Sequence, residues 1–547
     1  MPAGNPHPIK PLVRAMGLAL SLGIFAAPRG AEAVQVVSLA NVNGANGFRI
    51  DGISKRQFAG FPLSAIGDIN GDGLDDISIG AYFNDAGTGF VVYGRASGDP
   101  FPAVLALADL NGSNGFRIDG ENVLDRTTYS MHAAGDINGD SMADLIFGAP
   151  KADPGGATDA GSAYVLFGRA AGNPFPAVVS TTDIQGAVGF RMNGAAADDR
   201  FGHGVTTVGD FNGDTVDDFV VSAIQADPLM RMDAGTAYVV YGRTTGFADV
   251  IDISTLTPST GLVLQGISPD DKTGRDSAAA GDINGDGADD MIIGAFNALA
   301  MGGISFVLFG DATPPMSGVI DLATLDGSNG FRLNPGTLNG TSRNVAGGFD
   351  LNQDGRADLG VSGWLSPPME TGSASIVYGQ PSSFTFPASM DLSMLDGMDG
   401  FNLIGDAPDD RFGYSLDGAG DINGDGIDDL IVSAYQTEIV RTEPSRYYLI
   451  FGRPGPAPFN ASIPISSLDD ASAIRFDLVD ATDGGGVAVS PAGDLNDDGF
   501  DDLIVGSWLS TPDGGELAAG SAYVIYGGNP LPILASPEIF EDGFESN

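Results

Sequence analysis

Short apolar segments of strand-forming residues recur along the whole chain. Runs such as ISIGA at 77–81, FVVSA at 219–223 and LIVSA at 430–434 are typical of β-strands. A second set is rich in Tyr, Val, Ile and Phe: FVVYGR at 90–95, AYVLFGR at 163–169, AYVVYGR at 237–243, FVLFG at 306–310, SIVYG at 375–379, YYLIFGR at 447–453 and AYVIYGG at 522–528. No stretch beyond residue 33 keeps a helical period, so the pattern predicts an all-β chain.

Each run of the first set follows an acidic loop, which appears first as DINGDGLDD at 68–76. The seven copies begin at Asp68, Asp136, Asp210, Asp282, Asp350, Asp421 and Asp494, with 68 to 74 residues between successive starts. A period of this size, used seven times, indicates one structural unit repeated seven times. Each unit has four β segments, and the fourth precedes a Gly-Phe pair, as in LADLNGSNGF at 107–116.

The acidic loops carry side-chain oxygens at alternating positions. Counted from the first Asp, positions 1, 3, 5 and 9 are Asp, Asn, Asp and Asp in every copy. Ca²⁺ takes roughly six to eight oxygen ligands, whereas three carboxylates within one loop would repel one another without a cation. We therefore predict up to seven Ca²⁺ sites. Their ligands would be Asp68, Asn70, Asp72 and Asp76; Asp136, Asn138, Asp140 and Asp144; Asp210, Asn212, Asp214 and Asp218; Asp282, Asn284, Asp286 and Asp290; Asp350, Asn352, Asp354 and Asp358; Asp421, Asn423, Asp425 and Asp429; and Asp494, Asn496, Asp498 and Asp502.

Two other interpretations of these loops compete with a Ca²⁺ site. One is a row of Asx turns, because Asp, Asn and Gly are common turn residues; turns alone do not require Asp at positions 1, 5 and 9 in every copy. The other is an EF-hand, which needs Glu at position 12, where this chain has only Ile, Val or Phe. Position 6 is Gly in five copies but Ser141 and Thr215 in two, and we expect those two loops to bind less tightly, because a positive φ is costly for them.

The repeats resemble the FG-GAP repeats of integrin α-chain β-propellers. The resemblance is carried by DRFGHGVTTVGDFNGDTVDDFVVSA at 199–223, by DRFGYSLDGAGDINGDGIDDLIVSA at 410–434 and by FGAP at 147–150, and it extends over residues 34–528. It implies an all-β fold, a seven-bladed β-propeller with four-stranded blades, and Ca²⁺ bound between the first and second strands of a blade. An unmatched fourth element, SLANVNGANGF at 38–48, predicts that the ring is closed by the N-terminal strand. We expect residues 34–40 to pair with 521–527.

Residues 1–33 are predicted to be a signal peptide. Lys10 and Arg14 precede the apolar run at 16–27, and Ala31-Glu32-Ala33 forms an A-x-A cleavage site. The run is shorter than the ~20 residues of a membrane span, and no other segment suits one. We expect bacterial export to the extracellular space or cell surface. Residues 529–547 are interpreted as a disordered acidic tail.

The composition narrows the classes of partner. The chain has 71 acidic and 25 basic residues, for a net charge of −46, which argues against binding to nucleic acid or anionic membranes. It has no cysteine, so bound metal would take the stabilising place of disulfides. We expect a monomer.

The sequence favours a binding function over catalysis. No HExxH, G-x-S-x-G or phosphate-loop motif is present, and the two histidines of the repeats, His132 and His203, are expected to pack in the core or between blades. We predict a secreted Ca²⁺-binding module for binding or cell adhesion, not an enzyme, with an extracellular protein or glycan as its ligand. The alternative is a propeller enzyme acting on a polysaccharide or another extracellular polymer.

The partner is expected on the face opposite the acidic loops. Connections between second and third strands vary in length there, from 82–88 to the longer 150–160, 224–234 and 508–519, and variable loops on a rigid scaffold often carry binding residues. Met230, Arg231, Met232 and Trp508 are the predicted exposed candidates.

Overall fold

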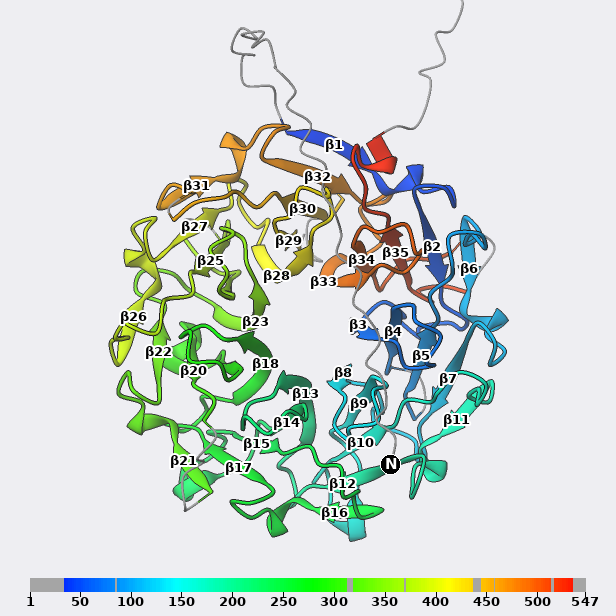
Figure 1. Ribbon diagram of the computed structural model, residues 1–547, viewed down its shortest axis with the longest axis vertical. Helices are drawn as coiled ribbons and strands as arrows, with labels where there is room; N and C mark the ends of the chain where they lie inside the picture. Colours follow the sequence, from blue (N-terminus) through cyan, green and yellow to red (C-terminus); the bar gives the residue numbers. More distant parts are fainter. Residues whose placement is uncertain are drawn as a thin grey trace, which may run out of the picture.

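Seven β-sheets surround a central channel (Figure 1). The computed structural model describes residues 34–83, 86–311, 318–367, 370–435, 444–456, 458–512 and 516–534. The predicted fold class, a seven-bladed β-propeller, is confirmed. The α-helical content of these described ranges is the single short helix α1 (Ala298–Met301).

Within each blade four strands run antiparallel from the channel outwards. The innermost strands are β3 (Leu63–Gly67), β8 (Met131–Gly135), β13 (Phe201–Gly209), β18 (Thr273–Gly281), β23 (Thr341–Phe349), β28 (Phe412–Gly420) and β33 (Gly485–Gly493). The second strands are β4 (Asp76–Ala81), β9 (Asp144–Ala149), β14 (Asp218–Ala223), β19 (Asp290–Ala295), β24 (Asp358–Gly363), β29 (Asp429–Ala434) and β34 (Asp502–Ser507). The third strands are β5 (Thr88–Val92), β10 (Ser162–Leu166), β15 (Thr236–Val240), β20 (Ile304–Leu308), β25 (Ser373–Val377), β30 (Arg446–Ile450) and β35 (Ser521–Ile525). The fourth strands are β7 (Gly115–Asp119), β12 (Gly189–Asn193), β17 (Gly261–Gln265), β22 (Gly330–Asn334), β27 (Gly400–Ile404), β32 (Ala473–Asp477) and β2 (Gly47–Asp51).

Each blade also has a short fifth strand, which the sequence did not predict. The next repeat supplies it, and it lies parallel to the fourth strand, as β11 does beside β7. The fifth strands are β11 (Val178–Ser180), β16 (Val250–Asp252), β21 (Val319–Asp321), β26 (Ser389–Asp391), β31 (Ser462–Pro464), β1 (Gln35–Ser38) and β6 (Val104–Ala106). Short 3-10 turns lie at Leu39–Asn41, Leu107–Asp109, Pro154–Gly156, Thr181–Asp183, Pro228–Met230, Ile253–Thr255, Leu322–Thr324, Leu392–Met394, Ile465–Ser467 and Pro532–Leu534. A repeat therefore ties itself to the blade before it as well as forming its own.

The N-terminal segment closes the ring, but with a different strand from the one expected. The predicted pairing of residues 34–40 with 521–527 is wrong, because β2 at Gly47–Asp51 pairs antiparallel with β35. Residues 35–38 instead form β1, which pairs parallel with β32 of the preceding blade. The N-terminal strands thus complete two blades, and the last described segment, Pro532–Leu534, lies beside β1 (Figure 1).

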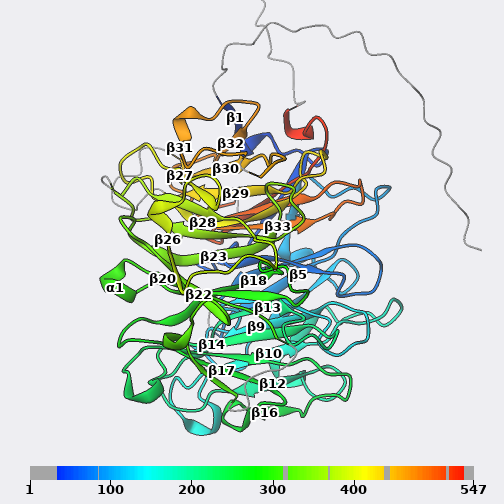
Figure 2. The same ribbon diagram turned by 60° about the vertical axis from the view of Figure 1, so that its left-hand side comes forward.

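The hydrophobic core lies between the blades. Each of seven buried clusters joins residues of two neighbouring blades; one joins Phe48 and Val524 of the last blade to Ile77 and Phe90 of the first. Second strands are buried along their whole length, which explains their continuous apolar sequences. Stacking of blades seals both faces of every sheet, so the two rims of the disc remain for function (Figure 2).

Candidate functional site

The seven acidic loops join first to second strands and therefore lie on one rim, here called the acidic face. Each first Asp folds the loop around its carboxylate. Asp68 accepts hydrogen bonds from the backbone N–H groups of Gly71 at 2.6 Å, Asp72 at 3.1 Å and Gly73 at 2.7 Å. Asp72 in turn accepts from the Leu74 N–H at 3.0 Å. The loop therefore has the Asx-turn geometry that the sequence analysis gave as an alternative to a Ca²⁺ site.

The ninth residue of each loop is a fully buried Asp that ties the loop to the blade. Asp76 accepts from the backbone N–H of Ile69 at 3.0 Å and from that of Gly94, just after the third strand, at 2.9 Å. The second of these bonds occurs in all seven blades at 2.8–3.0 Å. Burial raises the pKa of Asp144 and Asp218 to about 8, and nearby loop carboxylates add to the shift. The buried position therefore disfavours the ionised form.

The donor set of the loops suits a hard cation. Positions 1, 3, 5 and 9 offer only carboxylate and amide oxygens, the ligands that Ca²⁺ prefers. The buried Oδ1 atom of Asn496 has no hydrogen-bond partner, so it remains available to a metal. The structure brings positions 3 and 9 together, as where the Asn70 amide lies 3.4 Å from Asp76 Oδ2. Across the described ranges, however, no three His, Cys, Asp or Glu side chains form a group that could hold a metal ion. The Ca²⁺ sites therefore stay a prediction.

An acidic position outside the predicted ligand set connects neighbouring blades. The eighth loop residue is Asp75, Asp217, Asp289, Asp428 or Asp501 in five copies. Each carboxylate accepts the backbone N–H of the first Asp in the preceding loop at 2.7–3.1 Å, as Asp217 does from Asp136. Gly135, just before this N–H, has a φ of 81°, and a Cβ there would lie 2.4 Å from Asp217. The Asp-Asp pairs at positions 8 and 9 were the sequence signal for this contact.

Alanine takes the eighth position in the two remaining copies, Ala143 and Ala357. Because alanine has no acceptor, the interfaces between blades 1 and 2 and between blades 4 and 5 lack this carboxylate bond. We call the bond the carboxylate latch.

The rim opposite the acidic loops, here called the opposite face, carries many exposed apolar side chains. They are Phe83, Val123, Leu124, Leu229, Met230, Met232, Leu299, Met301, Val479 and Leu517. All lie in second-to-third or fourth-to-first strand connections. Met230 is 97 % exposed and Met232 63 %, as predicted.

Two of the other predicted contact residues are engaged within the protein. Arg231 forms an ion pair with Asp321 at 2.8 Å, so its charge is not free for a partner. Trp508 is half-buried, with its ring centroid 5.3 Å from that of Phe58 and 6.0 Å from that of Phe83. Both side chains are half-buried, so the expectation of exposure is only partly met by Arg231 and by Trp508.

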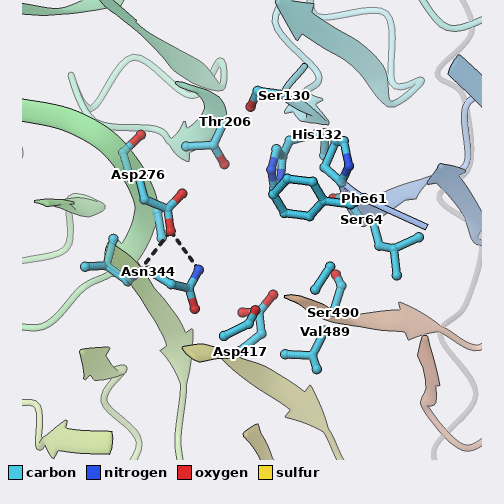
Figure 3. A pocket seen from close by; sticks show the side chains of 18 of the residues that line it. Phe61, Ser64, Ser130, His132, Thr206, Asp276, Asn344, Asp417, Val489 and Ser490 are labelled. Carbon is cyan, nitrogen blue, oxygen red and sulfur yellow. Dashed lines mark hydrogen bonds between the residues drawn. The ribbon is translucent and has the colours of Figure 1, made fainter. Parts of the chain in front are cut away.

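The innermost strands line a central cavity of about 290 Å³ (Figure 3). Seven residues before the first Asp of each loop, one side chain from every blade faces this cavity. These side chains form the mouth ring, which consists of Phe61, Tyr129, His203, Arg275, Arg343, Tyr414 and Val487. The first strands run towards the acidic face, so the mouth ring lies at the opposite face. The mouth ring could not be recognised in the sequence, because only its spacing repeats, whereas the residue type changes from blade to blade.

His132 lines the cavity as well. The buried His203 also packs against Tyr129 of the neighbouring blade, with ring centroids 4.7 Å apart, so the expected packing between blades is confirmed for His203. Figure 3 shows His132, Ser130, Thr206, Asp276, Asp417 and Ser490 around the same space. Asp276 accepts from the Asn344 side-chain amide at 2.7 Å and from the Val345 N–H at 3.0 Å. Burial, with the nearby Asp276, raises the pKa of Asp417 to about 8.

Comparison with known proteins agrees with the geometry. A family model described as the FG-GAP repeat matches residues 129–166 and 412–439. The chain is 30 % identical over 198 residues to integrin alpha-PS2 of Drosophila melanogaster, which covers 36 % of this chain and 12 % of that protein. It is 28 % identical over 249 residues to integrin alpha-V of Gallus gallus, covering 42 % and 19 %. The FG-GAP, integrin alpha-like resemblance is thereby confirmed.

A relative named as an enzyme also matches. Phosphatidylinositol-glycan-specific phospholipase D of Bos taurus is 29 % identical over 171 residues, covering 31 % of this chain and 18 % of that protein. The chain thus spans less than a fifth of the length of each of these three relatives. No helix within the described ranges is long and apolar enough to cross a membrane.

Proposed function

We propose that this protein is a secreted, Ca²⁺-binding β-propeller that serves as a binding or adhesion-type interaction module. The observation that carries the proposal is the difference in surface residues between the two rims. Repeated acidic loops occupy one face, while exposed apolar side chains and the second-to-third strand connections of variable length lie on the other. Exposed apolar groups on a rigid scaffold favour protein or glycan contact.

The similarity to integrin alpha chains supports a binding role outside the cell. In this proposal residues 1–33 direct export, residues 34–528 form the propeller and 529–547 are an acidic tail. The loop positions given above hold Ca²⁺, which would supply positive charge to the crowded carboxylates. Within the chain, the ninth Asp fixes each loop to its third strand and the first Asp orders the loop amides.

A surface array tests the proposal. The mature chain should bind a defined subset of extracellular proteins or glycans in millimolar Ca²⁺, and binding should weaken in EDTA. Absence of any specific binder under both conditions contradicts a binding module. Turnover of an arrayed polysaccharide would instead favour the enzymatic alternative.

Replacing residues 224–234 with the short 82–88 connection locates the contact. The graft removes Met230 and Met232, which are the most exposed apolar side chains of their loop. Binding should fall if this loop is part of the site. The same graft at 150–160 is the matched control, since that loop lacks exposed large apolar residues.

A further inference from the structure

The mouth ring concentrates positive charge in a protein with a net charge of −46. Arg275 and Arg343 stand on adjacent blades and both line the cavity. Arg126 and Arg200 lie close enough that, together with Arg275, they help to lower the pKa of His203, although burial is the larger cause. Several guanidinium groups therefore act on one small region of the opposite face.

These arginines are not neutralised by ion pairs within the described part of the chain. Some arginines elsewhere have a carboxylate partner: Arg475 lies 2.8 Å from Asp477, and Arg411 lies 2.8 Å from Glu370. Neither Arg275 nor Arg343 has such a contact. The Arg343 guanidinium lies over the Tyr414 ring at 4.1 Å and donates to the Tyr414 hydroxyl.

Arg275 is held in a similar way. Its guanidinium lies 5.2 Å from the ring centroid of Phe296, and its buried Nε–H has no hydrogen-bond partner. Both guanidinium groups are thus oriented by aromatic side chains, and Arg275 keeps its Nε–H free. A planar guanidinium group held in this way can bind a carboxylate.

The cavity carboxylates do not cancel this charge. Asp276 is occupied by the two donors described above, and Asp417 is neutral at pH 7 because its pKa lies near 8. Burial also raises the pKa of Asp276, so the ionised form is disfavoured for both carboxylates near the two arginines. A bound anion would restore the balance.

The other side chains that line the cavity indicate which kind of ligand bears the anionic group. Thr206, Ser490 and His132 bring neutral donors and acceptors into the cavity (Figure 3). His203 is 7 % exposed, and its Nδ1 atom has no hydrogen-bond partner. Hydroxyl groups of a ligand would satisfy these atoms, whereas the aliphatic stem of an acidic amino acid would leave them unpaired. The volume of about 290 Å³ is near the lower end of small-molecule sites, roughly 300–1,000 Å³, so it suits one ring-sized unit.

We propose that the mouth of the central channel binds the carboxylate of a uronic-acid sugar residue, held by Arg275 and Arg343, with the cavity hydroxyl and imidazole groups bonding the sugar hydroxyls. The proposal rests on the binding function above and names the ligand class of that function.

Calorimetric titration of the mature chain in Ca²⁺ tests this assignment. The probes are trigalacturonic acid, its methyl ester and a triglutamate peptide. Esterification removes only the charge, so the acid should bind about tenfold or more tighter than the ester. Equal affinity for acid and ester overturns the proposal without any need for a variant. Equal or tighter binding of triglutamate overturns the choice of a sugar.

Single substitutions test which residues bind the carboxylate. Arg275→Gln and Arg343→Gln should each weaken the acid about tenfold, with little change for the ester, and Arg275→Lys should restore part of the affinity. Arg475→Gln, on an outer strand, is the matched control and should bind as the wild type does. Unchanged binding by both mouth variants excludes this site.

The surface array separates this proposal from the proposed function. If the array finds other ligands but no acidic sugar, the ligand class is wrong and the binding module stands. If the array finds no ligand, the proposed function itself fails.

Discussion

The sixth residue of each acidic loop needs a positive φ, and two loops meet this need without glycine. Ser141 has a φ of 70° and Thr215 a φ of 73°, close to the 89° of Gly73. This confirms the backbone conformation expected from the sequence. A Cβ added at Gly73 meets no atom within 4 Å, so the penalty at this position is backbone strain rather than crowding.

Thr215→Gly should therefore stabilise the protein. Relief of the left-handed strain, about 1–2 kcal/mol, exceeds the extra chain entropy of glycine, about 0.5–1 kcal/mol. Urea unfolding should show a higher midpoint with an unchanged slope. Gly73→Thr is the reciprocal control and should lower the midpoint; a lower midpoint for Thr215→Gly would refute the strain argument.

Asp417 should make stability depend on pH. Its folded pKa of about 8 lies above the unfolded value of about 3.9. The folded state therefore keeps a proton that the unfolded state releases, and the stability this gives is lost as the pH rises through 8. Asp417→Asn cannot titrate, so its melting temperature should fall less than that of the wild type between about pH 6 and pH 9. The exposed Asp183→Asn should keep the wild-type slope, and an identical slope for Asp417→Asn would contradict the assignment.

At the scale of the elements, periodicity predicted much of the fold. The four antiparallel strands and the acidic loops follow directly from repeated apolar runs and turn residues. The fifth strands escaped notice because segments such as Val104–Ala106 are three residues long and carry no period of their own. The closing strand was misplaced by one segment: QVVS at 35–38 pairs with the preceding blade, whereas the strand that enters the last blade is GFRID at 47–51.

The acidic loops were located by sequence, but their contacts were not. Spacing showed which residues share a loop. The structure adds that the ninth Asp bonds to the N–H just after the third strand and that the eighth Asp bonds to the preceding blade. The mouth ring depends on seven first strands that converge across 427 residues, from Phe61 to Val487. Such convergence appears only once the ring is closed.

The N-terminal strands should be indispensable for folding. Strand β2 lies between β35 and β6, so its removal exposes two strand edges and opens the ring. A chain lacking residues 34–51 should lose its cooperative melting transition in circular dichroism. Removal of β1 alone, which pairs on one side with β32, should lower the melting temperature but keep the transition. A cooperative transition after loss of residues 34–51 would show that closure is dispensable.

For the whole molecule, Ca²⁺ should act as a distributed stabiliser. Extracellular Ca²⁺ modules bind with affinities of ~10⁻⁴–10⁻³ M, so about 10 mM Ca²⁺ should stabilise each occupied site by roughly 1–3 kcal/mol. The melting temperature should therefore rise from EDTA to Ca²⁺ by more than Mg²⁺ achieves. Coincident melting curves in EDTA and in Ca²⁺ would rule out metal binding by the folded loops.

The carboxylate latch is absent at two of the seven interfaces between blades, so it divides the ring into two arcs. It joins blades 2, 3 and 4 into one arc and blades 5, 6, 7 and 1 into another, and it is missing where Ala143 and Ala357 stand. The first and last described segments, β1 and Pro532–Leu534, lie together inside the longer arc, at the interface between blades 6 and 7, where a latch is present. The latch therefore stabilises the interface between blades 6 and 7, where the first and last described segments lie. The two interfaces without a latch are crossed by continuous backbone. A ring built in this way can flex as two rigid halves without parting at its termini.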